Sequence, residues 1–144
     1  MKTRKGNKVY PLTNAQKLHF YCLKYCPKKQ VLNIGASLTI QVDLDREMLK
    51  KSIEEAISRC EAMRLRFAED KEGNTWQYVV KQDDSFVEHF DFTGWTMEAA
   101  QKKMEEWTET PFPRFDSPMH HIVMIKLPDG FQGIYIAVDH MTMD

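Results

Sequence analysis

The strongest candidate for chemistry in the sequence is the pair His140 and Asp144, which stand four residues apart directly after an apolar stretch. A neutral imidazole in a loop that follows a strand could accept a proton from an attacking amine or hydroxyl group. The aspartate could instead bind backbone amides or a distant arginine and hold the shape of the loop. An HxxxD spacing is common by chance, so taken alone the pair equally fits a surface loop at the end of the chain.

The adjacent residues His120 and His121 are a second candidate for a histidine motif with a downstream aspartate. The position five residues after His120 is Ile125, inside an apolar segment, and not an aspartate. We therefore expect His120 and His121 to have a structural role within a strand.

Three possible metal ligands, His19, Cys22 and Cys26, fall along one face of a predicted helix. No fourth ligand is evident, and a packed helix face explains the cysteines equally well. The sequence therefore predicts no metal site.

Three helices are predicted from cap residues and apolar spacing. Thr13, with Gln16 three positions later, has the spacing of a capping box. Asp45 and Thr96 are N-cap candidates for the other two helices. Prolines end the first and the third helix, because their rings disfavour helical backbone. We expect these helices over residues 13–26, 45–60 and 96–110.

Extended segments lie between and after these helices, and they are expected over residues 31–44, 64–68, 76–81, 86–90, 119–127 and 131–138. The last two should form a hairpin around the turn Pro128-Asp129-Gly130. Branched apolar residues alternate along 134–138, so one face of this hairpin should be buried. The expected fold is an α/β (α+β) layered sandwich with a mixed sheet covered by helices, and residues 1–9 should form a flexible arm.

Composition narrows the class of protein. The 144 residues suffice for one domain, and 42% hydrophobic with 28% charged residues is typical of a globular chain. A formal net charge of -1 argues against nucleic-acid binding, which needs many uncompensated cations. No apolar run approaches the roughly 18 residues of a membrane span, and no signal peptide is evident. The three cysteines form no paired framework, so we expect a cytoplasmic protein.

Three segments together resemble a known family. Tyr10-Pro11-Leu12-Thr13-Asn14-Ala15-Gln16 resembles the opening motif of the condensation domains of nonribosomal peptide synthetases. The segment Arg59-Cys60-Glu61-Ala62-Met63-Arg64-Leu65-Arg66-Phe67 is similar to their second motif, RHExLRxxF, and Asp139-His140-Met141-Thr142-Met143-Asp144 is similar to their core motif, HHxxxDG. Their order and approximate spacing match over nearly the whole chain from Tyr10 onward. The superfamily also holds chloramphenicol acetyltransferase and other HxxxD acyltransferases.

The resemblance implies acyl transfer from a thioester to an amine or hydroxyl acceptor. The thioester would be carried by phosphopantetheine on an acyl or peptidyl carrier protein, or by coenzyme A, and no tightly bound cofactor is expected. Family members have two similar lobes, so we expect residues 10–144 to be the N-terminal lobe, cut at the HxxxD motif and inactive without the C-terminal lobe. Two alternatives remain: a non-catalytic condensation-like binding module or inactive fragment, and a free-standing O-acyltransferase of the alcohol or wax-ester type.

The resemblance also implies roles for single residues. His140 matches the catalytic histidine, acting as general base or as a group that orients the acceptor and steadies charge. Asp144 matches a structural aspartate that pairs with an arginine, and Arg64 of the second motif could be a structural partner. The chain departs from the core motif at Asp139, which replaces the first histidine, and from the second motif at Cys60.

Overall fold

The structure, a computed structural model, describes residues 3–143 of the chain. Its helices are α1 (Asn14–Tyr25), α2 (Arg46–Arg59) and α3 (Met97–Glu109), with a 3₁₀ turn η1 (Ala62–Arg64). Its strands are β1 (Thr3–Arg4), β2 (Asn7–Pro11), β3 (Asn33–Ile40), β4 (Leu65–Glu69), β5 (Thr75–Val79), β6 (Glu88–Asp91), β7 (His120–Lys126) and β8 (Gln132–Asp139). The predicted helices and strands from residue 13 onward are all present, with ends shifted by a few residues.

The helix caps that the sequence predicts are confirmed. Thr13 and Gln16 form a capping box, in which each side chain accepts a hydrogen bond from the backbone N–H of the other residue. Asp45 accepts from the N–H of Met48, and Thr96 accepts from the N–H of Ala99. Each cap satisfies a backbone donor that a helix N-terminus otherwise leaves without a partner.

The strands form two sheets, and the mixed sheet that we expected is the larger of them. The larger sheet has the order β3-β8-β7-β6, and it is mixed because β6 runs parallel to β7 while the other neighbours are antiparallel. The smaller sheet, β1-β2-β5-β4, is antiparallel throughout. Local sequence patterns do not reveal which strands pair across a long stretch of chain. The division of the strands into two sheets could therefore not be predicted from them.

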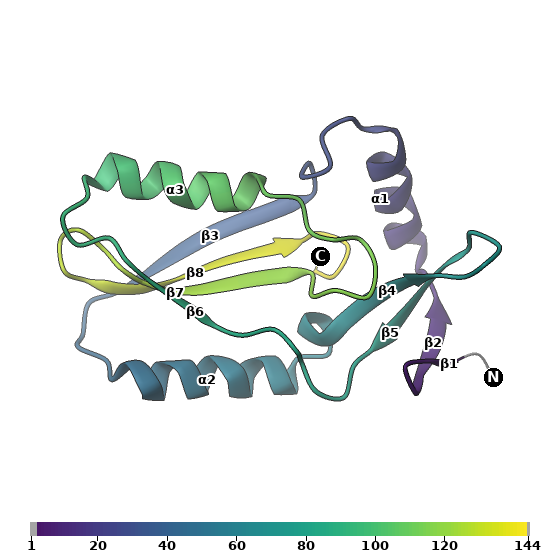
Figure 1. Ribbon diagram of the computed structural model, residues 1–144, viewed down its shortest axis with the longest axis horizontal. Helices are drawn as coiled ribbons and strands as arrows, with labels where there is room; N and C mark the ends of the chain where they lie inside the picture. Colours follow the sequence, from purple (N-terminus) through teal and green to yellow (C-terminus); the bar gives the residue numbers. More distant parts are fainter. Residues whose placement is uncertain (1–2, 144) are drawn as a thin grey trace.

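Helices cover both faces of the larger sheet, with α3 on one side and α2 on the other (Figure 1). Ile122 and Met124 of β7 pack in the cluster that contains α2, whereas Val123 and Ile125 pack in the cluster beneath α3. Successive side chains of a strand point to opposite faces, so a strand between two helical layers buries both sets. The layered sandwich is confirmed, and so is the buried face expected for the β7–β8 hairpin, whose second face is also buried.

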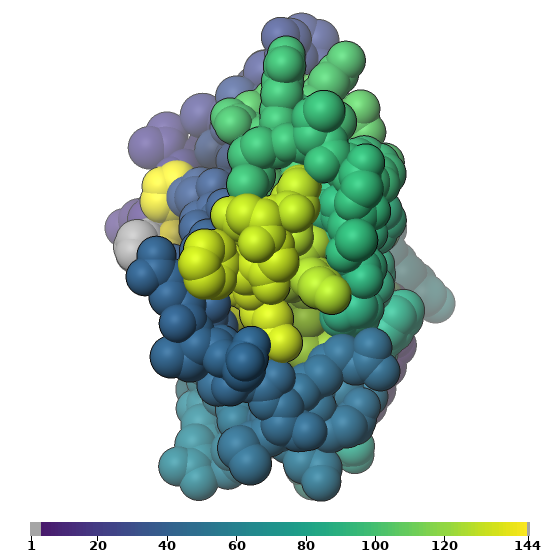
Figure 2. All heavy atoms as spheres, turned by 90° about the vertical axis from the view of Figure 1, so that its left-hand side faces the viewer, coloured from purple at the N-terminus to yellow at the C-terminus, as the bar shows by residue number. Residues whose placement is uncertain are grey.

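The hairpin turn reaches the end of the sandwich that Figure 2 shows face on. There the atoms of the turn between β7 and β8 lie between the start of α2 below and the segment leading into α3 above. The turn is where it was predicted: Gly130 has φ 89, and its N–H donates to Leu127 O at 2.9 Å.

Residues 3–11 form a hairpin and not the flexible arm expected over residues 1–9. Lys5 and Gly6 both have positive φ, the conformation of a tight two-residue turn, and β2 then pairs with β5. Arg4 is held by an ion pair with Asp116. The charged, polar composition of this segment concealed a strand because its partner, β5, lies far along the chain.

Helix α1 lies where the two sheets meet, beside the end of β8 (Figure 1). Its buried Leu23 packs in a third cluster with Phe67 of β4 and with Met119 and Met141, which flank β7 and β8. This cluster joins α1 and both sheets at the point where the chain leaves β8 for residues 140–143.

Candidate active site

A tight turn at the end of β8 presents His140. The side chain of Asp139 accepts a hydrogen bond from Met141 N at 2.8 Å, and the backbone oxygen of Asp139 accepts from Thr142 N at 3.0 Å. The N–H of His140 donates to Leu32 O at 2.9 Å, just before β3. Residues 139–143 are named here the histidine loop. Hydrogen bonds within the loop and to Leu32, just before β3, therefore fix its start.

A hydrogen bond to the backbone selects the tautomer of the neutral His140 ring. Its Nδ1 lies 2.6 Å from the backbone oxygen of Met143. A carbonyl oxygen can only accept, so Nδ1 carries the hydrogen and Nε2 of the neutral ring keeps a free lone pair. The half-buried imidazole thus has the tautomer that a proton acceptor at Nε2 requires.

A second histidine, His19 of α1, lies against the ring of His140. The two ring centroids are 4.7 Å apart, with 35° between the ring planes. Cys22, the next possible ligand on the same helix, is exposed. Within residues 3–143 no group of three or more His, Cys, Asp and Glu side chains is placed to hold a metal ion.

Asp139 points into the protein, where only 1% of its surface is exposed. Its Oδ2 lies 3.7 Å from Nη1 of Arg114, and Nη1 also contacts the sulfur of Met141 at 3.2 Å. Burial raises the pKa of the Asp139 carboxyl, while its bond from Met141 N and the charge of Arg114 act in the opposite direction. Asp139 and Arg114 therefore support the histidine loop from inside, and sequence patterns did not single out Arg114.

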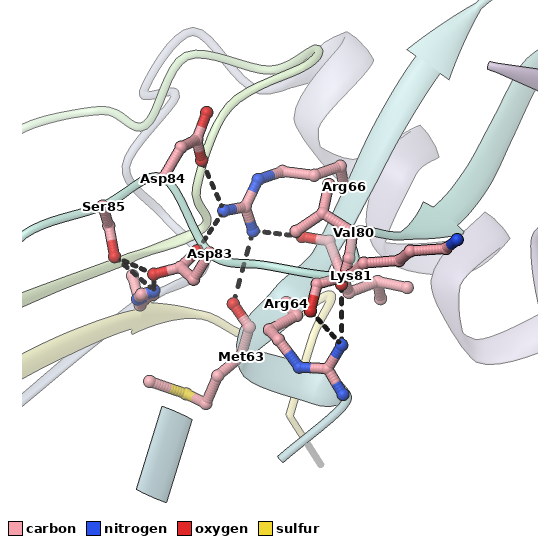
Figure 3. Close-up of polar contacts among 10 residues, drawn as sticks. Met63, Arg64, Arg66, Val80, Lys81, Asp83, Asp84 and Ser85 are labelled. Carbon is pink, nitrogen blue, oxygen red and sulfur yellow. Dashed lines mark hydrogen bonds and ion pairs between the residues drawn. The ribbon is translucent and has the colours of Figure 1, made fainter. Parts of the chain in front are cut away.

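Arg64, the arginine expected to have a structural role, binds backbone. It is the last residue of η1, and its Nη1 donates to Val80 O at 2.6 Å and to Lys81 O at 3.5 Å (Figure 3). These bonds hold the chain as it leaves β5. Asp144 lies outside the described residues. The expected pairing of Asp144 with an arginine therefore stays a prediction.

Arg66 is the more deeply buried arginine of this region, with 1% of its surface exposed. It forms ion pairs with Asp83 and, at 3.0 Å, with Asp84, and it donates to the backbone oxygens of Met63 and Leu65 (Figure 3). Sequence patterns missed this network. The signal available in the sequence was Arg66 itself, a charged residue within a predicted strand. A buried charge of this kind needs an oppositely charged partner.

His120 joins the same network, and His121 lies beside it. Nε2 of His120 is 3.4 Å from Asp83 Oδ2 and 3.3 Å from Ser85 Oγ. Burial lowers the pKa of His120 to about 4, although the charge of Asp83 acts to raise it. His121 is half-buried and contacts Glu88 at 3.2 Å. Both side chains are part of β7, as the sequence predicted.

No helix within residues 3–143 is both long enough and apolar enough to cross a membrane.

Comparison with known proteins gives a family match over almost the whole chain. The model of the family described as "Condensation domain" matches residues 6–144. Surfactin synthase subunit 1 of Bacillus subtilis (strain 168) is 29% identical over 139 residues, which are 94% of this chain and 4% of that protein.

Solved structures with the same fold are also condensation domains. The first condensation domain of the calcium-dependent antibiotic synthetase, in complex with substrate analogue 2a, has a TM-score of 0.80 at 23% identity, covering 92% of this chain and 33% of that one. The starter condensation domain of rhizomide synthetase RzmA has a TM-score of 0.82 at 19% identity, covering 95% and 33%. A mutant of that domain in complex with C8-CoA has a TM-score of 0.81 at 18% identity, covering 93% and 31%. The chain spans about a third of the length of these domains.

Proposed function

The chain belongs to the condensation-domain family, and from that premise we propose that it supplies the histidine-bearing lobe of an enzyme that transfers an acyl group from a thioester to an amine. The observation that carries the proposal is the state of His140. Its Nδ1–H is bound to Met143 O at 2.6 Å, so Nε2 is left as an acceptor at the end of a rigid strand. That is the arrangement of a group that takes or orients the proton of a nucleophile.

In the proposed reaction the amine nitrogen attacks the thioester carbonyl carbon. The new C–N bond forms, the C–S bond breaks, and the thiol leaves with a proton while the amine loses one, giving an amide. Nε2 of His140 accepts the amine proton, or orients the amine by a hydrogen bond and steadies the charge that develops. Both roles need the same tautomer of His140.

The proposed donor is an acyl group on phosphopantetheine of a carrier protein or on coenzyme A. The family supports a thioester donor, and the rhizomide synthetase domain that shares this fold is solved with C8-CoA. The donor is a substrate, and the proposal includes no tightly bound cofactor.

We propose that the rest of a condensation domain covers the part of the larger sheet that α2 leaves open. Ile34 and Leu38 of β3 are 47% and 62% exposed. They pair with Val138 and Ile134 of β8, whose side chains pack in the α2 cluster, so they lie on the same face of the sheet. Apolar side chains of this size in a row are typical of a surface that another part of the protein covers.

The remaining motif residues are proposed as structural. Asp139 and Arg114 shape the histidine loop, Arg64 holds the end of β5, and Asp144 is proposed to stabilise the loop. The second candidate function, a binding module without transfer, is favoured by Asp139, since this carboxylate stands where the family motif has a histidine.

The test is an assay of the full-length protein with acyl-coenzyme A and acyl-carrier-protein donors, each offered to amine and hydroxyl acceptors. Mass spectrometry of the products should find an amide. Ester products alone would identify an O-acyltransferase. Binding of the carrier protein, measured by calorimetry, without any transfer would contradict the proposal and identify a binding module.

A further inference from the structure

The contact between His19 and His140 has no counterpart among the motifs of the chain. Both side chains are half-buried, and their ring centroids are 4.7 Å apart with an angle of 35° between the planes. Rings at this distance, with planes tilted by this angle, are closer to offset stacking than to an edge-to-face arrangement. One face of the His140 ring is therefore covered by a side chain that comes from α1, at the other end of the sequence.

Helix α1 is a firm support for this contact. Gln16 lies three positions before His19, on the same side of the helix, and its Nε2 donates to Met141 O at 3.2 Å and to Gln77 Oε1 at 2.8 Å. The buried Leu23 fixes the helix further along, in the cluster that contains Met141. Two successive side chains of one helix face thus contact the histidine loop, Gln16 at its backbone and His19 at the imidazole.

The His140 ring needs such a support because, within residues 3–143, its ring is held by a single hydrogen bond, from Nδ1 to Met143 O. A half-turn of the ring about χ2 exchanges Nδ1 with a carbon, which breaks the bond to Met143 O and moves Nε2 away from its acceptor position. Asp139 does not prevent this turn, because its carboxylate is engaged with Met141 N and Arg114.

We propose that His19 is a positioning residue: its ring lies on His140, keeps that ring from turning, and so holds Nε2 toward the acceptor. The inference rests on the proposed role of His140. Because the contact is made by ring faces, a flat aromatic ring at position 19 is what the role requires, and the charge of an imidazole is not.

The kinetic test compares variants of the full-length protein. His19→Ala and His19→Leu should lower kcat on the order of tenfold with the KM for the donor unchanged, because a misplaced proton acceptor affects the chemical step and not binding. His19→Phe should stay within about twofold of the wild type because it keeps the ring. Cys22→Ala, one helical turn further on and exposed, is the matched control. Full kcat in His19→Ala, or a His19→Phe enzyme as slow as His19→Ala, would overturn the inference.

A spectroscopic test separates this inference from the proposed function. Long-range ¹H–¹⁵N NMR of the imidazoles, recorded at about pH 8.5 where an ordinary imidazole is neutral, reports the tautomer of His140. The wild type and His19→Phe should show only the form with hydrogen on Nδ1, and His19→Leu should show a mixture of both forms. A single unchanged tautomer in His19→Leu contradicts the positioning role, even in a protein that transfers no acyl group.

Discussion

At the residue scale, the Asp139 carboxylate and the Arg114 guanidinium are the groups that shape the loop around His140. Asp139 binds the loop backbone through Met141 N, and Arg114 contacts Asp139 and the sulfur of Met141. A histidine at position 139 could not make the same pair with a cation. In this chain the carboxylate at position 139 lies beside a basic side chain, Arg114.

Asp139→Asn tests the cost of burying this carboxyl. Burial raises the pKa of Asp139 in the folded state, so folding favours the protonated form. The stability that follows is present below the ordinary pKa of 3.8 and is lost as the pH rises through the raised value. We expect the wild type to lose stability relative to Asp139→Asn as the pH rises from the ordinary pKa of 3.8 through the raised value, as measured by urea unfolding at each pH. A difference that stays constant, or that changes in the other direction, would refute this account of Asp139.

The sequence located His140 and Asp139 but not the side chains that hold them. His140 stands in a local motif, and local motifs can be read without a structure. His19 and Arg114 reach it from α1 and from the segment before β7, so their contacts depend on tertiary packing. The sequence did single out His19, but as a possible metal ligand with Cys22 and Cys26, because helix periodicity shows which residues share a face and not what that face contacts.

At the scale of elements, α1 connects the cap at its start to the histidine loop. Gln16 has two tasks: its Oε1 closes the capping box with Thr13, and its Nε2 donates to Met141 O. Among residues 3–143, the side chain of Thr13 bonds only within the cap. Variants of the two residues can therefore distinguish the effect of helix stability from the effect of the hydrogen bond to the histidine loop.

Thr13→Ala should lower the free energy of unfolding by about 1 kcal/mol, the usual effect of removing an N-cap, and should leave kcat nearly unchanged. Gln16→Ala should lower stability by a similar amount and should also reduce kcat several-fold, because the loop backbone loses its donor. Thermal unfolding and steady-state kinetics of the same two variants of the full-length protein check this. Equal kcat in both variants would mean that Gln16 serves the helix alone.

Much of the element order could be predicted, and the partition of the strands could not. Caps, prolines and the Pro128-Asp129-Gly130 turn are local signals, and they located all three helices and the β7–β8 hairpin. The pairing of β2 with β5 joins distant segments. The same limit concealed the second face of the larger sheet, since Tyr135 and Ala137 are buried only because α3 packs above them.

At the scale of the whole molecule, the buried network around Arg66 joins the two sheets. Arg66 lies on β4 of the smaller sheet, and His120 lies on β7 of the larger one. Asp83 contacts both side chains from the segment between β5 and β6. Stability of the folded lobe should therefore depend on the charge state of this cluster.

Acid should destabilise the protein through His120. Burial lowers the pKa of His120 from 6.5 to about 4 in the folded state. The unfolded chain takes up the proton first, so the stability present above pH 6.5 is lost as the pH falls toward 4. The pKa difference corresponds to about 3 kcal/mol.

The measurement is the free energy of unfolding from pH 7 to pH 4 in wild type and in two glutamine variants. His120→Gln should show a smaller loss than the wild type over this range. His89→Gln removes an exposed histidine of β6 and should retain the wild-type loss. An identical pH dependence in His120→Gln and wild type would show that another group controls acid stability.

The central claim is that His140 is the catalytic histidine of an acyl-transfer site. Its most direct test is the single-turnover rate of amide formation by the full-length protein carrying His140→Gln. The matched control is His121→Gln, which removes a half-buried histidine of β7. General acid–base catalysis contributes roughly 100- to 10,000-fold, so His140→Gln should slow transfer at least about 100-fold, while His121→Gln stays within about threefold of the wild type. A His140→Gln protein that folds and transfers the acyl group at near the wild-type rate would contradict the assignment.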